Sequence, residues 1–332
     1  MNTLFFIGNG FDINLGLPTR YRDFYRYYIG HPAFYDNNAI SVFKEEINSF
    51  LENKTGKSEN DIDWADLELG LGAYTEELSP EDYDSIHLDV MHCLMEYLLS
   101  VENSFSPNQA LKEKIIGDFC RPDQNDYFNP TEKNQINDFK KELEFLNIIN
   151  FNYTHTVETI FEYTGENISL GANSRNVEVQ LNGIVHVHHS LSDNHILLGV
   201  NDESQIQSSE FRENPDVLDL LLKPRTNNMM GLNIDGYCKR LISYSSFFVL
   251  FGVSLGDTDK LWWQTLGHRF VTADCRILYF VHAEDLDPDY ELHQGKIKRY
   301  YKRKLFKAMN IENRYNNLSD RVFIGYGTNI FR

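Results

Sequence analysis

The sequence has little of what marks disulfide-rich or zinc-stapled proteins. Only four of its 332 residues are cysteine, and no two are close enough for a C-x-x-C pair: Cys93, Cys120, Cys238 and Cys275. This spacing excludes a dense disulfide framework and a four-cysteine zinc ribbon. We therefore expect four reduced and mostly buried thiols.

Long hydrophobic runs are also missing. No stretch approaches the roughly 18 consecutive apolar residues that a membrane-spanning helix needs. The opening residues, MNTLFFIGNG, have no basic lead, and their apolar run is too short for a secretory signal. We therefore expect a cytoplasmic protein that makes no membrane contact.

Basic residues are scarce. Thirty-one Lys and Arg stand against 49 Asp and Glu, which gives a formal net charge of −18. A protein that binds duplex DNA usually carries a basic stripe, because counterion release supplies much of its affinity. The charge balance therefore argues against nucleic acid as a partner.

What the sequence does contain is a series of short apolar runs, which are typical of buried strands in a parallel sheet. We place strands at 4–7, 145–152, 177–188, 195–200, 246–253, 276–281 and 321–326. Helical spacing lies between several of them, at 19–28, 155–164, 204–221, 258–270 and 292–309. This alternation predicts an α/β fold with a mainly parallel sheet flanked by helices.

Residues 31–144 have a different character. They are rich in Asp, Glu, Lys and Asn, and they show amphipathic helical periodicity in AISVFKEEINSFLEN, DWADLELGLGAYTEEL and IHLDVMHCLMEYLLSVENSF. We interpret them as a helical insertion or subdomain. Residues 1–30 and 145–332 are then expected to form one domain around the sheet.

The first candidate for ligand binding is GNGFDINLGLP, which directly follows the apolar run LFFI. Gly8, Asn9 and Gly10 thus lie at the carboxyl end of a predicted strand, where open parallel sheets bind ligands. A Gly-x-Gly turn lets backbone N–H groups approach a phosphate, and the next helix adds its positive end. Ile13 replaces the third glycine of the dinucleotide fingerprint, so a tight turn with no ligand is the alternative.

The second candidate is INFNYTHTVE, residues 149–158. Asn152 follows an apolar strand, where its amide could orient a water molecule and a ribose hydroxyl. Thr154 or Thr156 is available to cap the next helix. The alternative role for Asn152 is a cap or an Asx-turn.

The third candidate is NGIVHVHHS, residues 182–190. On a strand, His186 and His188 point to one face and His189 to the other. A neutral imidazole beside a sugar can act as a general base. Two histidines on one face could instead share a metal with an acid such as Asp202. For His186 and His189 we favour ordinary interior or surface roles.

The fourth candidate is FFVLFGVSLGDTDKLWW, in which a buried strand leads into Gly252 and Ser254. Small residues and a hydroxyl at a strand end suit a nucleotide, and a capped turn is the alternative. All four candidates follow apolar strands. They could therefore converge on one crevice, which favours a nucleotide site over any single alternative.

These stretches resemble two related groups of proteins. GNGFDINLGLP, NFNYT, VHH and FGVSL are similar, in this order, to the nucleotide-binding, catalytic-asparagine, His-Gly and Gly-x-Ser motifs of sirtuin-like proteins. FIGNGFDINLGLPTRYRDF, DWADLE, NFNYT, HVHHSL and GVSLGDTD resemble the bacterial abortive-infection AbiH family more closely. The resemblance runs from Phe6 to about Asp259 and implies a divergent branch of the sirtuin-like, Rossmann-type fold.

The resemblance implies a role for particular residues. Asn152 and His188 are expected to be catalytic, and the cofactor site is expected to include Gly8, Asn9, Gly10, Asp12, Gly252, Ser254 and Glu68. Trp64 accompanies Glu68 in DWADLE. No metal ligand is expected.

Three departures from the sirtuin pattern qualify these roles. Thr154 stands where sirtuins usually have Asp, and His189 replaces the glycine after the family histidine, so we expect a different loop there. The cysteine pairs of the small zinc module are absent, which argues against peptide deacetylation.

The resemblance implies an antiphage abortive-infection effector that hydrolyses the nicotinamide–ribose bond of NAD⁺, its substrate, or acts on a related adenine nucleotide. Two alternatives stay open: a nucleotide-sensing partner of another defence effector, without catalysis, and a metal-dependent nuclease or phosphohydrolase. The sequence does not reveal the activating trigger. A phage-derived signal, a partner defence protein and assembly into a homo-oligomer are all compatible with it.

Overall fold

The structure is a computed structural model that describes residues 2–52, 66–122, 128–139, 144–172, 176–193, 195–231, 233–281, 293–326 and 329–332. These residues form two compact units. The sheet unit comprises Met1–Gly16, Ser106–Val187 and Ile234–Arg332, and the helical unit comprises Leu17–Phe105 and His188–Asn233. These boundaries differ from the predicted ones at residues 30 and 144, and the predicted domain division stays a prediction.

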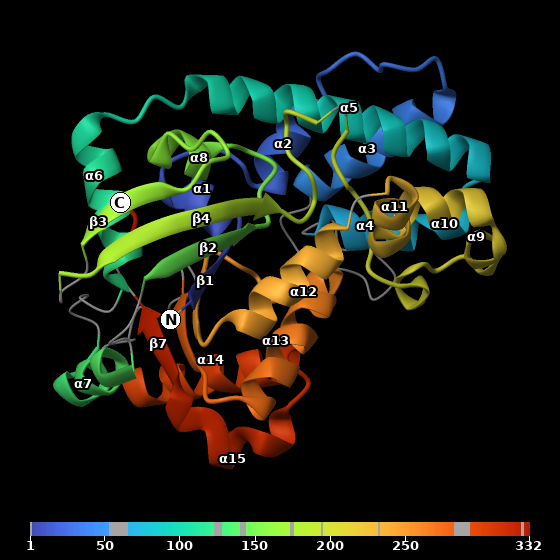
Figure 1. The fold of residues 1–332 in the computed structure, drawn as a ribbon. Helices are drawn as coiled ribbons and strands as arrows, with labels where there is room; N and C mark the ends of the chain where they lie inside the picture. The colour runs from blue at the N-terminus through green and yellow to red at the C-terminus, as the bar shows by residue number, and fades with distance from the viewer. Residues whose placement is uncertain are drawn as a thin grey trace. The chain divides into compact units, whose positions relative to one another are not determined.

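The sheet unit is built on seven strands, which occupy the middle of its ribbon (Figure 1). The order across the sheet is β3-β4-β2-β1-β5-β6-β7. The strands are β1 (Asn2–Ile7), β2 (Phe145–Asn150), β3 (Ile168–Ala172), β4 (Glu178–His186), β5 (Phe247–Phe251), β6 (Arg276–Val281) and β7 (Val322–Tyr326). Only β3 is antiparallel to its neighbour, β4, and the other pairs are parallel. The predicted α/β fold with a mainly parallel sheet is confirmed.

The parallel strands have the topology of dinucleotide-binding folds. With the edge strand β3 set aside and the rest numbered along the chain, their order is 3-2-1-4-5-6. Two halves then meet where β1 lies beside β5. In open α/β sheets this reversal point is where a crevice at the carboxyl ends of the strands receives ligands. The fold is therefore compatible with a Rossmann-type sheet.

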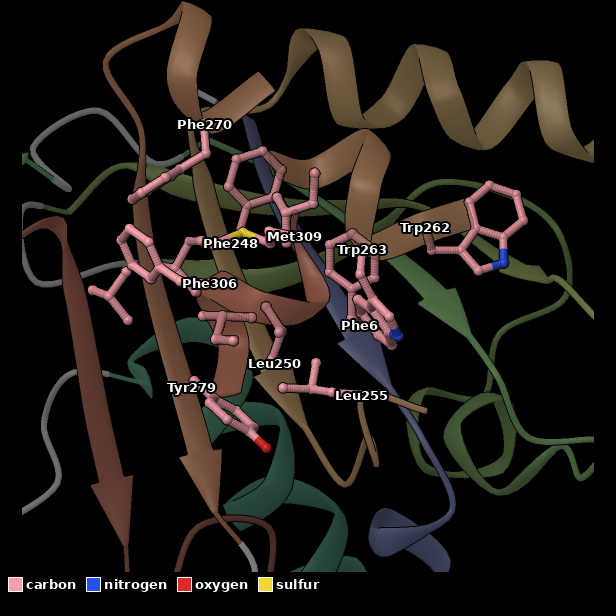
Figure 2. Close-up of a cluster of buried hydrophobic side chains, with 14 of the residues drawn as sticks. Phe6, Phe248, Leu250, Leu255, Trp262, Trp263, Phe270, Tyr279, Phe306 and Met309 are labelled. Carbon is pink, nitrogen blue, oxygen red and sulfur yellow. The ribbon is translucent and has the colours of Figure 1, made fainter. Parts of the chain in front are cut away.

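One face of the sheet is covered by three helices: α12 (Ile234–Tyr244), α13 (Lys260–Thr272) and α14 (Gln294–Ala308). Side chains from β1, β5 and β6 meet these helices in a large apolar cluster, part of which is drawn in Figure 2. Trp263 of α13 is almost fully buried there, and its ring lies 5.8 Å from that of Phe6 and 5.4 Å from that of Phe151. Such aromatic packing supplies much of the burial that stabilises a core.

The other face is covered by α1 (Gly10–Asn14), α6 (Gln109–Cys120) and α8 (Thr156–Phe161). Phe119 of α6 packs on Phe5 of β1 at 4.7 Å and on Phe161 of α8 at 4.9 Å between ring centroids. The last residues of the chain also pack here, because Phe331 lies 4.5 Å from Phe119 and Asn14 donates to its carbonyl oxygen at 2.7 Å. The sheet unit thus has helices on both faces.

The structure describes further elements of the sheet unit. They are α7 (Pro130–Phe139), α15 (Tyr315–Leu318) and three short 3₁₀ turns, η4 (Asp257–Asp259), η6 (Glu312–Arg314) and η7 (Ser319–Arg321).

The helical unit contains α2 (Tyr21–Tyr28), α3 (Asn38–Glu52), α4 (Leu67–Ala73), η1 (Tyr74–Glu77), α5 (Pro80–Ser104), η3 (Glu203–Gln205), α9 (Ser209–Glu213), α10 (Pro215–Leu221) and α11 (Lys223–Met229). Ser79 caps α5 by accepting from the Asp82 N–H, and Pro80 begins the helix. Tyr83 of α5 meets Phe211 edge-on at 5.3 Å within a second apolar cluster. The helical periodicity predicted for residues 39–105 is therefore confirmed wherever the structure describes it.

Two of the predicted elements do not form as predicted. The run 195–200 is not a strand: the Leu197 N–H donates to the His188 carbonyl, and Val200 makes only an isolated bridge to Leu222. The predicted helix at 204–221 is divided into η3, α9 and α10, because Asn214 ends α9 and Pro215 begins α10.

All four cysteines are free and buried, as predicted. Among the described residues, no helix is long and apolar enough to cross a membrane.

Candidate functional site

Four strands of the sheet unit end at one edge. Ile7, the last residue of β1, pairs with Asn150 of β2 and with Phe251 of β5, and Asn150 pairs with His186 of β4. Because these strands are parallel, the residues that follow them lie along the same edge. The structure thus brings part of each of the four predicted stretches to this edge: the Gly8–Asp12 turn, Asn152, His186 and the turn that begins at Gly252.

The glycines of the β1 and β5 turns permit a close backbone approach. A Cβ on Gly10 would lie 2.5 Å from the Gly252 Cα, and a Cβ on Gly8 would lie 2.6 Å from the Gly252 oxygen. Gly252 also has φ of +70°, which favours glycine. The Gly8 and Gly10 N–H groups donate to the carbonyls of Phe251 and Gly252 at 3.0 and 2.9 Å. These two amides join the turns, and the prediction that they hold a phosphate stays a prediction.

Asp12 links this turn to the segment after β2. It is 1% exposed, and its carboxylate accepts hydrogen bonds from the hydroxyls of Thr154 and Thr156, both at 2.6 Å. The prediction that one of these threonines caps α8 is wrong, since the N-cap residue is His155 and makes no side-chain cap. Their hydroxyls instead donate hydrogen bonds that offset part of the free-energy cost of burying the Asp12 carboxylate.

The same carboxylate fixes the direction of the Asn152 amide. The Asn152 Nδ2 group donates to the Asp12 Oδ1 at 3.4 Å. Because a carboxylate only accepts, the amide nitrogen faces Asp12 and the Oδ1 oxygen faces away from it. That oxygen is buried and has no hydrogen-bond partner among the described residues. A buried acceptor of this kind is costly unless a water molecule or a ligand supplies a donor.

His186 makes a second set of polar contacts at this edge. Its Nδ1 lies 2.7 Å from the Asn152 carbonyl oxygen, and its Nε2 lies 2.7 Å from the Glu158 Oε1. The His186 and Glu158 side chains are only 12% and 15% exposed. His186 is therefore not an unattached surface histidine, and Glu158 is a site residue that the sequence analysis missed.

Ser254 and Asn9 lie in more accessible positions. Both are exposed, and the Ser254 hydroxyl accepts from the Gly256 N–H at 3.2 Å. This local bond is an ST-turn, and η4, which follows it, has no side-chain cap. Their role as cofactor residues stays a prediction.

The remaining predicted residues belong to the helical unit. Glu68 of α4 is 5% exposed and forms an ion pair with Lys223, which is 4% exposed, at 2.7 Å. The Gly199 N–H lies 3.5 Å from the other Glu68 oxygen. Lys223 was missed because a lysine in LLKPR gives no sign of burial. Trp64 lies outside the described residues.

His188 and His189 follow β4, which ends at His186 rather than at 188. His188 is 6% exposed, and its carbonyl accepts the Leu197 N–H. His189 has φ of +61°, the left-handed conformation that favours glycine. The backbone that suits glycine is thus present although the residue is histidine, and the His189 Nε2 lies 3.3 Å from the Asn227 Oδ1.

The alternative of a metal site gains no support from the described part of the chain. No group of three His, Cys, Asp or Glu side chains there is arranged to hold a metal ion. Asp202, offered above as a further ligand, instead caps η3 by accepting from the Ser204 N–H. The metal-dependent alternative stays untested.

Comparison with known families gives an independent finding. The family described as bacteriophage abortive infection AbiH matches residues 4–281. This range includes every predicted site residue in both units. No curated protein matches the chain.

Proposed function

The chain belongs to the bacteriophage abortive-infection AbiH family, and from this premise we propose that it binds NAD⁺ and hydrolyses the nicotinamide–ribose bond. The family supports a role in phage abortive infection. The site is the edge where β1, β2, β4 and β5 end, with Asn152 as a catalytic residue.

One observation carries the proposal: the order of the six parallel strands. A 3-2-1-4-5-6 order brings two mononucleotide-binding halves together between β1 and β5, and ligands of such sheets lie outside the carboxyl ends. A dinucleotide spans such a reversal point, because each half of the sheet can receive one nucleotide. The Gly10–Gly252 contact forms the base of this region.

Asn152 supports a hydrolytic role at this edge. Its Oδ1 is a buried acceptor held in one direction by Asp12, so it suits a water molecule or a ribose hydroxyl, both of which donate. Cleavage passes through a transition state with positive charge on the sugar, which an amide oxygen also stabilises. Asp12 acts at a distance by orienting this amide.

His188 is proposed as a catalytic base on the family resemblance alone. It belongs to the helical unit, where its burial limits contact with bulk water. Glu68 and its partner Lys223 belong to the same unit, and the part of Glu68 in nucleotide binding rests on the resemblance to DWADLE.

The experiment follows nicotinamide release from NAD⁺ by the purified protein and by two variants. Asn152→Ala removes the oriented amide, and Asn147→Ala removes another buried asparagine of β2 as the matched control. We expect wild-type release, a loss of about 10²–10³-fold for Asn152→Ala, and a much smaller change for Asn147→Ala.

Two outcomes would contradict the proposal in different ways. Release that survives in Asn152→Ala would remove the assigned residue. Thermal stabilisation by NAD⁺ without nicotinamide release, even with a phage lysate added, would replace hydrolysis by nucleotide sensing.

A further inference from the structure

Glu158 presents one oxygen that the fold does not use. Its Oε1 is held by the His186 Nε2 at 2.7 Å. Its Oε2 is buried and has no hydrogen-bond partner among the residues that the structure describes. Buried carboxylate oxygens are normally hydrogen-bonded, so this oxygen marks a place for a donor that the described residues do not supply.

His186 fixes the direction of this carboxylate. Its Nδ1 faces the Asn152 carbonyl, which can only accept, so Nδ1 carries a hydrogen. The contact between Nε2 and Oε1 holds one further hydrogen, carried by the ring or by the carboxylate. Both ring nitrogens are occupied, and His186 therefore holds Glu158 in place rather than touching a ligand.

The same imidazole ties Glu158 to the candidate catalytic asparagine. His186 bonds the Asn152 main chain on one side and Glu158 on the other. Asn152 precedes α8, and Glu158 lies in its first turn. Asp12, another acid at this edge, is almost fully buried, but both of its oxygens accept from Thr154, Thr156 and Asn152. Glu158 thus retains an open acceptor position that Asp12 lacks.

We propose that Glu158 is a catalytic carboxylate, positioned by His186, whose Oε2 accepts a hydrogen bond from an O–H group at the reacting sugar. This inference rests on the proposed hydrolysis of NAD⁺ and assigns the water proton to Glu158 rather than to His188, whose assignment rested on the family resemblance alone. The O–H group is the attacking water or a ribose hydroxyl.

The step balances without a further reactant. The water oxygen bonds to C1′ of the ribose as the C1′–N bond breaks, and the electron pair of that bond returns to the pyridine nitrogen. The products are neutral nicotinamide and ADP-ribose. The water proton passes to Glu158 and then to solvent, as in general base catalysis.

The test compares Glu158→Gln with Glu162→Gln. Glutamine at 158 has nearly the same shape but cannot take up a proton. Glu162 ends the same helix, is 72% exposed and pairs with Lys112, so it is a matched control outside the site. We expect kcat to fall by about 10²–10⁴-fold in Glu158→Gln with little change in KM, and neither to change in Glu162→Gln.

His186 provides the test of positioning. His186→Ala should lower kcat with little change in KM. His186→Gln, which can still donate to Glu158, should recover part of the loss. Circular dichroism and melting temperatures identify any variant that fails to fold. If Glu158→Gln does not fold, formate rescue of nicotinamide release by Glu158→Ala serves as the second measurement, because formate replaces the missing carboxylate.

ADP-ribose binding shows whether the O–H group belongs to water or to a ribose hydroxyl. It also separates a failure of the Glu158 inference from a failure of the proposed hydrolysis. Weaker binding by Glu158→Gln supports a ribose hydroxyl, whereas unchanged binding with lowered kcat supports water. A wild type that binds without nicotinamide release contradicts hydrolysis, and Glu158 then stands only if Glu158→Gln weakens binding. Wild-type kcat and binding in Glu158→Gln overturn the inference, as does a wild type that neither binds nor cleaves.

Discussion

Buried ionisable side chains are confined to a few positions, and their partners determine what each one does. Asp12 has two hydroxyl donors, and Glu68 has a lysine. His87 has one partner for two ring nitrogens, since its Nε2 lies 2.8 Å from the Leu198 carbonyl and its Nδ1 has none among the described residues. Each arrangement leads to a different response when pH or a partner changes.

His87 should make the helical unit sensitive to mild acid. Burial lowers the pKa of His87 below its ordinary value of 6.5. The unfolded chain then takes up the proton first, so the stability due to neutral His87 is present above pH 6.5 and lost as pH falls below it. We expect up to about 1.4 kcal/mol of unfolding free energy to be lost per pH unit.

Urea titrations at pH 5, 6, 7 and 8 test this expectation on the wild type and on His87→Gln, which can still donate to Leu198. The variant should lose less stability between pH 7 and pH 5. Equal pH slopes for the two proteins would show that another group titrates.

The Glu68–Lys223 pair should be strongly coupled. Lys223→Met leaves a buried carboxylate without its cation, and breaking such a pair costs about 3–5 kcal/mol. The double variant Glu68→Gln with Lys223→Met removes both charges and should be less destabilised than Lys223→Met alone. Unfolding free energies of the four proteins give the coupling, and additive effects would contradict it.

At the scale of elements, the glycine turns after β1 and β5 pack closely against each other. Gly10→Ala places a methyl group 2.5 Å from the Gly252 backbone, which cannot move aside as a side chain would. We expect a loss of about 1–3 kcal/mol of stability from this overpacking. The measurement is the midpoint of urea unfolding.

Gly117→Ala is the matched control for this turn. Gly117 lies in α6 of the same unit, and its new methyl would meet only the Arg121 side chain at 3.5 Å. Alanine favours a helix, so stability should stay equal or rise by up to about 1 kcal/mol. Equal losses of stability at both positions would show that the close backbone approach at Gly10 does not cause the loss in Gly10→Ala.

The sequence predicted strands correctly where a buried apolar run also pairs with a neighbouring strand. The apolar runs that became β1, β2, β5 and β6 are buried on both faces, as parallel strands are. The run 195–200 is as apolar and mostly buried, yet its N–H groups find carbonyls at His188 and Leu221 instead of a neighbouring strand. The hydrophobicity of a run predicts that it is buried. It does not predict which carbonyl groups accept hydrogen bonds from the backbone N–H groups of that run.

The candidate site was predictable to a similar degree. Asn152 and the turn glycines were found because each follows an apolar run. Glu158 was missed because its role depends on His186, which is distant in the sequence and reaches it only through the sheet. The threonine caps were mispredicted for the same reason, since Asp12 competes for both hydroxyls.

At the scale of the whole molecule, the strand order is the property that the sequence alone did not reveal. Alternating strands and helices predicted a parallel sheet, but several strand orders satisfy that alternation. The observed order places β1 between β2 and β5 and gives the dinucleotide topology. The AbiH match over residues 4–281 adds a role in phage abortive infection.

The most direct measurement is a crystal structure of the protein with ADP-ribose, the product that hydrolysis would leave bound. We expect the pyrophosphate to lie across the carboxyl ends of β1 and β5. A ribose hydroxyl or an ordered water should lie about 3 Å from the Asn152 Oδ1. ADP-ribose bound at any other part of the chain, with nothing beside Asn152, would contradict the proposed site.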